Sequence, residues 1–455
     1  MKLPLVARAA GKAIALQVHG VKSANAWRAK QSVALRRWLD VSGFAGKSGD
    51  AALLPGGKPA AIAVAGDDAS LWDYAALAAR LPRGIYRLAT PLASPAAERL
   101  ALGWAVHGYR FGRYKANAGP KIAQLAWPDG VDRARVGAAA EAIFLARDLI
   151  NTPAGDMGPE ELAAAAQALA RKFGAKCQIT SGEKLRKEWP LVHAVGRASS
   201  RPPRLVDLRW GPENAPRITL VGKGVCFDSG GLDLKPASGM LTMKKDMGGA
   251  AHVLGLAHML MAARLRLRLR VLIPAVENAV SGNAFRPLDV IKSRKGITVE
   301  IGNTDAEGRL ILCDCLHEAA LEKPAMIVDF ATLTGAARVA LGAELPAMFC
   351  NDDALAEALL KSGKQAQDPL WRMPLHRPYR RHLDSKIADI NNVGGDFGGA
   401  ITAALFLQEF VPDTVPWAHF DIMAWNQADR PGRPQGGEAM GLRAVYGAIV
   451  DRIGG

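Results

Sequence analysis

The chain has 455 residues, of which 49% are apolar and 22% charged, so it is too long for one ordinary domain and too apolar to be largely disordered. Its net charge of +15 is uneven, because residues 1–150 contain 21 basic and 10 acidic residues. A basic surface attracts polyanions, so nucleic-acid binding stays open beside the simpler interpretation of a basic face with no such partner.

The cysteine content and the hydropathy indicate a reducing compartment. Only Cys313 and Cys315 of the five cysteines are close in sequence, and Cys-x-Cys is not the spacing of a zinc knuckle, so we interpret them as core thiols. Arg8 and Lys12 interrupt the apolar residues at the N-terminus, and the longest apolar stretch, residues 250–263, is too short to span a bilayer. We therefore expect a cytoplasmic protein with no secretory signal and no membrane contact.

The first part of the chain, residues 1–131, has the pattern of a smaller N-terminal α/β domain. Short apolar runs at residues 13–16 and 61–64 indicate strands, and an Ala-rich stretch at residues 71–81 indicates a helix. Strands and helices that alternate in this way are typical of a layered α/β unit.

A long helical pattern follows. It begins near Asp132 and continues to Ile150, where the polar stretch 151–155, which contains Pro and Gly, predicts a stop. We assign residues 132–152 to a connecting helix and residues 153–455 to a larger C-terminal α/β domain, which carries the chemically active residues described below.

In the C-terminal domain, strand patterns alternate with helix patterns. The sequence predicts, in chain order, strand 218–221, helix 249–264, strand 265–274, helix 310–322 and strand 326–330. This alternation is typical of a central, mostly parallel sheet with helices on both faces. Functional residues in such sheets lie beyond the carboxyl ends of the strands.

Leucine and arginine alternate strictly from Leu265 to Arg270, which is the periodicity of a strand. The arginines of this face could be solvated, could pair with acids of a partner subunit, or could contact a polyanion. We favour the first two interpretations over the third.

Two polar, Gly-rich clusters stand next to predicted strands and helices. The first extends over residues 221–249 and the second over residues 303–309. We expect both clusters to be loops. They supply four carboxylates, two lysines and one arginine: Asp228, Asp246, Asp305, Glu307, Lys223, Lys235 and Arg309.

Carboxylates at this density repel one another and raise each other's pKa unless cations compensate. Two divalent metal ions would compensate the negative charge of four carboxylates, and a pair of ions bridged by carboxylates is a known hydrolytic arrangement. An Asp in a Gly-rich loop often only caps a turn. For any one of these acids, this interpretation is as good as a role as metal ligand, but it explains the whole set poorly.

Other kinds of site lack their full sequence patterns. The chain has no His-Glu-x-x-His, and its nine histidines show no ligand spacing. The stretch Asp228–Gly231 is similar to a serine-protease nucleophile loop but lacks the context of that all-β fold. Gly222-Lys223-Gly224 is not a phosphate loop, because the remaining glycine and the Ser or Thr are missing.

Both clusters resemble those of the leucyl aminopeptidase family, the hexameric dinuclear-metal aminopeptidases of peptidase family M17. Residues 303–310, Asn-Thr-Asp-Ala-Glu-Gly-Arg-Leu, match the family's signature octapeptide. The resemblance extends from about Asn151 to near the C-terminus, whereas residues 1–131 resemble the family only in size and α/β character. The spacing also agrees in the first cluster for Lys223, Asp228, Lys235 and Asp246.

The resemblance implies two divalent metal ions per subunit, Zn²⁺ or Mn²⁺. Asp228 and Glu307 would bridge both ions, Asp305 would complete the loosely held site, and Lys223 and Asp246 would complete the tight one. Lysine binds a metal only as the neutral amine, so the two cations would have to depress its pKa.

The same resemblance implies an enzyme that removes N-terminal residues from peptides by means of a metal-activated water. Lys235 would stay protonated and face the substrate carbonyl, and Arg309 would hold a bicarbonate ion that shuttles the proton. Met243, Thr332 and Gly335 would line the pocket for the first side chain and give a broad preference for apolar residues. A plain core role for Met243 is almost as good an interpretation.

The resemblance further implies a homohexamer that acts on peptide substrates. Met423 stands where a small residue is common in the family, and Asn426 where an apolar one is common, which puts a leucine preference in doubt.

The alternative function is nucleic-acid binding through the basic N-terminal domain, alone or beside peptidase activity. A catalytically inactive scaffold is disfavoured because every expected ligand is present.

Overall fold

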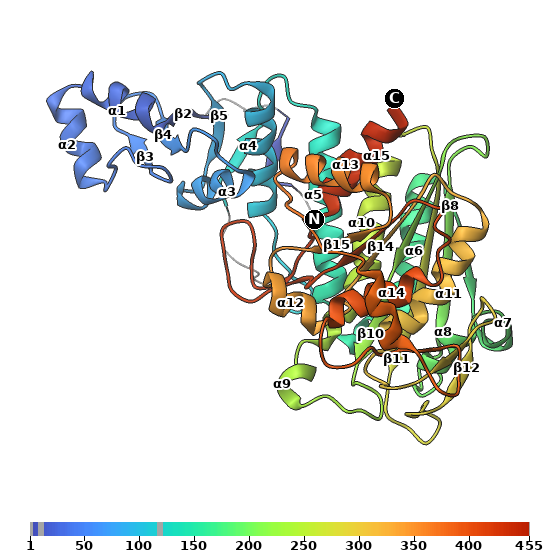
Figure 1. Cartoon of the computed structure of the whole chain (residues 1–455). Helices are drawn as coiled ribbons and strands as arrows, with labels where there is room; N and C mark the ends of the chain where they lie inside the picture. Colours follow the sequence, from blue (N-terminus) through green and yellow to red (C-terminus); the bar gives the residue numbers. More distant parts are fainter. Residues whose placement is uncertain (1–2, 8–12, 116–121, 455) are drawn as a thin grey trace. The chain divides into compact units, whose positions relative to one another are not determined.

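The computed structural model describes residues 3–7, 13–115 and 122–454 (Figure 1). Arg8 and Lys12 lie outside the described residues. The chain forms two compact units: an N-terminal unit of Met1–Phe144 with Gln427–Gln435, and a C-terminal unit of Leu145–Asn426 with Gly436–Gly455. None of the helices in the described ranges is long and apolar enough to cross a membrane.

The N-terminal unit contains a six-stranded sheet in the order β1-β6-β5-β2-β4-β3, parallel except between β3 and β4. The expected strands 13–16 and 61–64 and the expected helix 71–81 are confirmed as β2, β4 and α3. The strands are β1 Leu5–Val6, β2 Ile14–Gly20, β3 Ala51–Leu54, β4 Ala60–Ala65, β5 Ile85–Leu88 and β6 Gln124–Ala126. The helices are α1 Val21–Ala29, α2 Val33–Val41, α3 Leu71–Arg80 and α4 Ser94–His107.

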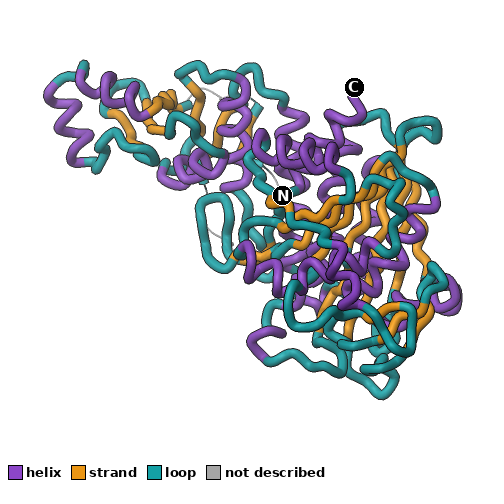
Figure 2. The backbone as a smooth tube through the Cα atoms, in the orientation of Figure 1, coloured by secondary structure: helices purple, strands orange, loops and turns teal. Residues whose placement is uncertain are grey.

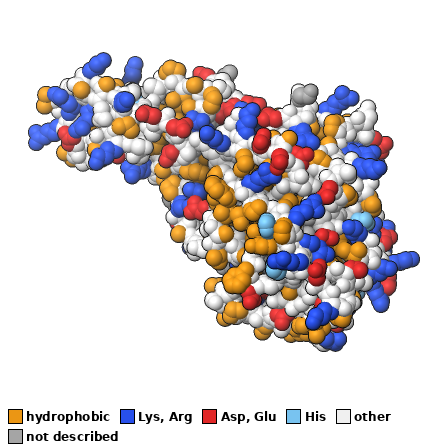
Figure 3. All heavy atoms as spheres, in the orientation of Figure 1, with side chains coloured by type: hydrophobic (Ala, Val, Ile, Leu, Met, Phe, Trp, Pro, Cys, Tyr) orange, Lys and Arg blue, Asp and Glu red, His pale blue; other side chains and the backbone are white. Residues whose placement is uncertain are grey.

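Exposed lysines and arginines gather on the helical end of the N-terminal unit, over α1 and α2 (Figure 3). They account for part of the basic excess expected from the sequence. The exposed basic residues of this segment include Lys22, Lys30, Arg36, Arg37 and Lys47.

The expected long helix is confirmed as α5, Arg133–Asn151. The two compact units separate within it, between Phe144 and Leu145. The domain limits 1–131 and 153–455 stay a prediction.

The C-terminal unit is built on a nine-stranded sheet in the order β16-β15-β18-β14-β9-β11-β8-β7, with β10 also paired to β11. Its central strands β18, β14, β9, β11 and β10 are mutually parallel, and the antiparallel pairs lie toward the edges. Figure 2 shows strands of the C-terminal unit side by side in orange, with helices around them. The strands of this sheet are β7 Lys176–Thr180, β8 Arg204–Trp210, β9 Arg217–Gly222, β10 Gly224–Asp228, β11 Arg268–Asn278, β14 Met326–Ala331, β15 Ala347–Cys350, β16 Trp371–Arg372 and β18 Trp417–Asp421.

Helices cover both faces of this sheet, as predicted. On one face α10, which contacts α6 and α15, packs on β9 and β14, and His252 of α10 stacks on Phe330 at 5.4 Å between ring centroids. On the other face α11, with α8 and α14, covers a core that includes Val221, Ile327 and Trp417. The α-helices of the unit are α6 Pro159–Phe173, α7 Gly182–Glu188, α8 Pro190–Gly196, α9 Ala237–Met240, α10 Gly248–Ala262, α11 Glu307–Leu321, α12 Gly335–Leu341, α13 Asp353–Gln365, α14 Gly399–Gln408 and α15 Leu442–Gly454.

Smaller elements complete the C-terminal unit. β12 and β13 form a three-stranded sheet with β17, and β19 pairs with β20. Their bounds are β12 Val290–Lys292, β13 Thr298–Glu300, β17 Ile390–Asn391, β19 Trp425–Asn426 and β20 Gly436–Gly437, and the 3-10 helices are η1 Ala154–Asp156, η2 Met243–Met247 and η3 Arg377–Leu383.

The five cysteines form no disulfide, and Cys313 and Cys315 are buried on α11, which confirms their interpretation as core thiols.

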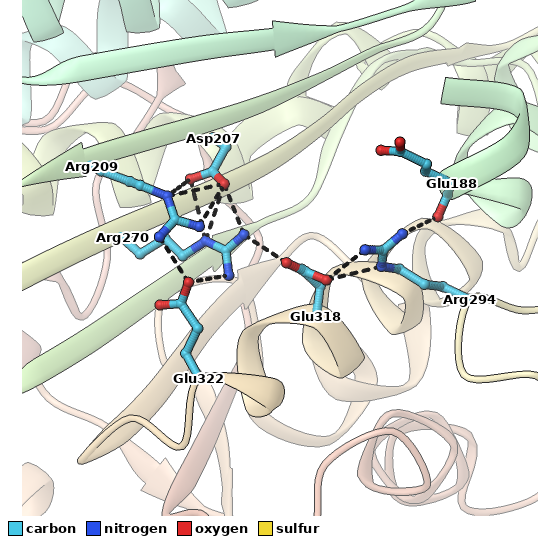
Figure 4. Close-up of polar contacts among 7 residues, drawn as sticks. All are labelled: Glu188, Asp207, Arg209, Arg270, Arg294, Glu318 and Glu322. Atoms are coloured by element: carbon cyan, nitrogen blue, oxygen red, sulfur yellow. Dashed lines mark hydrogen bonds and ion pairs between the residues drawn. The ribbon is translucent and has the colours of Figure 1, made fainter. Parts of the chain in front are cut away.

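The strand expected from residue 265 is wrong in its start, because β11 begins at Arg268 and Arg266 is exposed before it. Arg270 takes a role that none of the three interpretations included, since it pairs with acids of its own chain. Its guanidinium contacts Asp207 at 2.8 Å, Glu318 at 2.9 Å and Glu322 at 3.1 Å, and Figure 4 shows these acids converging on it.

Candidate metal centre

The predicted site residues gather where the parallel strands of the C-terminal sheet end. Lys223 follows β9, Asp228 ends β10, Asn278 ends β11, Thr332 follows β14 and Asp421 ends β18. Parallel strands present their carboxyl ends at one edge of a sheet, so residues far apart in sequence converge there.

A cavity of about 380 Å³ opens at this edge. Nine of the ten predicted site residues line it, and the tenth, Glu307, is buried beside Lys223. The nine are Lys223, Asp228, Lys235, Met243, Asp246, Asp305, Arg309, Thr332 and Gly335.

The expectation that these residues all stand in loops is wrong for three of the acids. Asp228 belongs to strand β10, Asp246 to η2, and Glu307 is the first residue of α11. The sequence did not predict β10, because Gly224 has the pattern of a loop residue. A glycine is needed here for strand pairing, since a Cβ on Gly224 would lie 2.6 Å from the carbonyl oxygen of Pro274 on β11.

Two lysines pair with the four carboxylates. Lys223 Nζ lies 2.7 Å from Asp246 Oδ2 and 2.9 Å from Glu307 Oε1. Lys235 Nζ lies 2.9 Å from Asp228 Oδ2 and also contacts Asp305 Oδ1. Each lysine therefore holds two carboxylates together that would otherwise repel one another.

The site is buried, and its electrostatics follow from this. Burial raises the pKa of Asp228 to about 6, and the charge of Asp246 adds to this rise. Burial also raises the pKa of Glu307 to about 8, with Asp228 adding to it. Burial alone would lower the pKa of Lys223, but the carboxylates of Asp246, Glu307 and Asp228 outweigh it and hold the pKa above its usual value. The cluster thus depends on compensating positive charge.

The signature segment is held in place by Asn392, which sequence reasoning missed. Asn392 Oδ1 accepts from the Gly302 amide at 2.8 Å, and its Nδ2 donates to the Asn303 carbonyl at 2.8 Å. The Asn392 carbonyl in turn accepts from Arg309 Nη1 at 2.6 Å. One residue therefore fixes both ends of the segment that presents Asp305.

Gly308 allows Lys223 to reach this segment. A Cβ at position 308 would lie 2.6 Å from Lys223 Cε and 2.7 Å from Nζ, closer than real Cβ atoms approach. The glycine of the octapeptide is thus explained by space for the lysine rather than by an unusual backbone angle.

Other supporting residues were missed as well. Asn278 Nδ2 donates to Asp228 Oδ1 at 2.9 Å. Thr332, which was expected only in the substrate pocket, donates from Oγ1 to Asp246 Oδ1 at 2.7 Å. Asp421 Oδ1 accepts from the Leu333 amide at 3.0 Å and so fixes the turn after β14.

The donor set fits divalent cations. Asp228, Asp305 and Glu307 each offer one oxygen, and these oxygens lie within 4.8 Å of one another. In the described part of the chain, Asp246 Oδ2, Asp305 Oδ1 and Glu307 Oε1 accept no hydrogen bond and contact only the lysine ammonium groups as ion pairs. Carboxylate oxygens are ligands that divalent cations such as Mn²⁺ accept readily.

Comparison with known proteins identifies the family. Residues 144–446 match the model of the cytosol aminopeptidase family, catalytic domain, and residues 14–128 match that of the M17 aminopeptidase, N-terminal domain. The chain belongs to the cytosol aminopeptidase family. The family resemblance and the two-domain α/β fold expected from the sequence are confirmed.

The relatives of this aminopeptidase cover nearly all of it. A protein from Bradyrhizobium sp. strain BTAi1, named "Probable cytosol aminopeptidase", is 42% identical over 87% of this chain and 80% of its own length. The crystal structure of the cytosol aminopeptidase from Coxiella burnetii is 48% identical, covers 99% of both chains and has a TM-score of 0.95. The bottromycin maturation enzyme BotP in complex with Mn is 35% identical, over 97% of this chain and 100% of that chain, with a TM-score of 0.86.

Membership of the family makes this protein a metal-dependent aminopeptidase that hydrolyses peptides. The comparisons give no support to the alternative of nucleic-acid binding, which stays a prediction from charge alone.

Proposed function

We propose that this aminopeptidase holds two divalent cations per subunit and uses them to remove apolar N-terminal residues from peptides. The observation that carries the proposal is the convergence of four buried or half-buried carboxylates on two lysines, with both lysines and three of the carboxylates lining one cavity.

The residues that would hold the cations are those named from the family resemblance. Asp228 and Glu307 would be shared, Asp305 would belong to one ion, and Lys223 and Asp246 to the other. When bound, two divalent cations lower the pKa of a water molecule toward neutrality and polarise the carbonyl that is to be attacked. The manganese complex of BotP supports Mn²⁺ as one suitable ion, and Zn²⁺ stays a second candidate.

Two basic residues of the cavity would act on the substrate directly. Burial would lower the pKa of Lys235, but its neighbours Asp228 and Asp305 outweigh this and keep it protonated, so it can donate to a developing oxyanion. Arg309 is buried and its Nε has no hydrogen-bond partner within the described ranges, so it would hold a small anion such as bicarbonate.

Met243, Thr332 and Gly335 would line the pocket for the first side chain, since all three border the cavity. A flexible thioether beside small groups suits apolar side chains of different shapes.

We also propose that the protein is a cytoplasmic homohexamer.

The test replaces one ligand at a time. Asp305→Asn and Glu307→Gln should each lower kcat/KM for leucine amide by at least about a thousandfold, because each removes a carboxylate from the cation site. Circular dichroism should show that both variants remain folded. The matched control is Glu357→Gln, an exposed residue of α13, which should retain full activity. Undiminished turnover in either site variant would overturn the assignment.

A further inference from the structure

Two cations in the cavity have no part in the proposed mechanism. Lys245, from η2, is only 1% exposed yet lines the cavity. Arg338, from α12, is half-buried and lines the same cavity. Its Nη2 lies 3.5 Å from the point where a Cβ on Gly335 would stand, so the guanidinium lies close to the pocket expected for the first side chain.

Among the described residues, neither the Lys245 ammonium nor the Arg338 guanidinium has a hydrogen bond or an ion pair. Lys223 and Lys235, by contrast, pair with all four carboxylates of the metal centre. The two remaining cations therefore do not compensate the metal ligands at contact distance.

The Lys245 ammonium is costly to bury, because burial removes most of its water and Asp246 and Asp421 attract its charge only from beyond ion-pair distance. In a cavity that admits substrate, the partner can come from the substrate. An arginine and a lysine that line one cavity can donate charge-assisted hydrogen bonds, which favour a carboxylate over a neutral amide of the same shape.

We propose that Lys245 and Arg338 form a carboxylate-binding subsite that selects among peptide substrates. The inference rests on the proposed peptidase function and adds a specificity to it. The carboxylate has two possible sources. It is either the C-terminal carboxylate of a dipeptide, which is compatible with an apolar first residue, or the side chain of an N-terminal Asp or Glu, which would replace the apolar preference proposed above.

The experiment compares substrates that differ only in one carboxylate, with the full-length enzyme loaded with Mn²⁺. The first pair is glutamyl-glycinamide and glutaminyl-glycinamide, which tests the side chain. The second pair is leucyl-glycine and leucyl-glycinamide, which tests the C-terminus. In one pair the carboxylate member should have a kcat/KM about tenfold higher or more, mainly through KM.

Variants then connect the preference to the two residues. Lys245→Met and Arg338→Gln should each reduce the ratio within that pair toward one, and comparing the two members cancels any general loss of activity. Lys361→Met, at an exposed position on α13, is the matched control and should keep the wild-type ratio. Arg338 is half-buried near the surface of a short helix, so Arg338→Gln tests the proposal even where Lys245→Met fails to fold.

Equal rates within both pairs for the wild-type enzyme, or an unchanged ratio in the folded variants, would overturn the subsite. Hydrolysis of the neutral leucyl-glycinamide would in either case leave the proposed peptidase function standing. Failure of the wild-type enzyme to cut any of the four substrates would overturn both proposals together.

Discussion

The Thr332 hydroxyl donates a hydrogen bond of 2.7 Å to Asp246 Oδ1, and Asp246 Oδ2 faces Lys223 at 2.7 Å. One oxygen of this carboxylate is thus fixed by a neutral donor while the other points to the metal centre. Groups that orient a metal ligand in this way commonly contribute to metal affinity without touching the ion.

Thr332→Val keeps the size of the side chain and removes this donor. We expect metal affinity to fall by about 10- to 100-fold, because Asp246 loses the hydrogen bond that orients it. Competition with a chelator, monitored by return of activity as Mn²⁺ is added, measures the change. Thr219→Val is the control, since Thr219 is a buried threonine of β9 that does not line the cavity. Equal metal affinity in wild type and Thr332→Val would show that the hydrogen bond has no such role.

The sequence predicted the residues that carry charge at the site better than those that support them. Asp305 and Glu307 stand in one dense octapeptide, so local pattern was sufficient to single them out. Asn278, Asn392 and Asp421 are single polar residues, and they bond to Asp228, Asn303 and Leu333, which lie 50, 89 and 88 positions away. Such pairs come together only because the ends of separate strands converge in the fold. No local sequence pattern indicates this convergence.

At the scale of elements, too, contacts between residues far apart in sequence could not be predicted from local patterns. A network of side-chain ion pairs joins β8, β11 and α11. Arg270 of β11 is 5% exposed and contacts Asp207 on β8 as well as Glu318 on α11 (Figure 4). Glu318 also pairs with Arg294 at 2.7 Å. The network fixes the helix against the outer part of the sheet.

Arg270→Met should destabilise the protein by about 1–3 kcal/mol, because the partly buried acids Asp207, Glu318 and Glu322 lose the cation that they share, while Arg209 and Arg294 still pair with them. Urea unfolding followed by tryptophan fluorescence measures the change. Arg266→Met removes the neighbouring arginine of the same Leu-Arg repeat, but Arg266 is exposed, so its effect should stay within about 0.5 kcal/mol. Similar stabilities for the two variants would refute the structural role of the network.

The alternation of leucine and arginine predicted a strand correctly from Arg268 onward but could not distinguish Arg266 from Arg270. Both arginines carry the same local pattern. The burial of Arg270 is set by Asp207 and Glu318, which lie 63 and 48 residues away. Strands β9 and β14 and helices α10 and α11 were predictable from their apolar residues, whereas β8 and β10, which also pair with β11, were not predicted.

At the scale of the whole molecule, the C-terminal unit leaves large apolar side chains in solvent. Leu241 is 82% exposed, Val339 90% and Phe397 89%. Figure 3 shows hydrophobic side chains grouped on the visible face of this unit. Exposed apolar groups of this kind commonly mark surfaces that another protein covers.

We expect the covering protein to be further copies of the same chain, in keeping with the proposed homohexamer and with the closed symmetry of most homo-oligomers. Sedimentation under conditions of full activity should give six times the chain mass of 48.3 kDa. Phe397→Glu should lower the mass by placing a charge in the apolar contact, whereas Val41→Glu, 81% exposed in the N-terminal unit, should not. Sedimentation of the active enzyme as a 48.3 kDa monomer would contradict the hexamer and would leave these side chains exposed in solution.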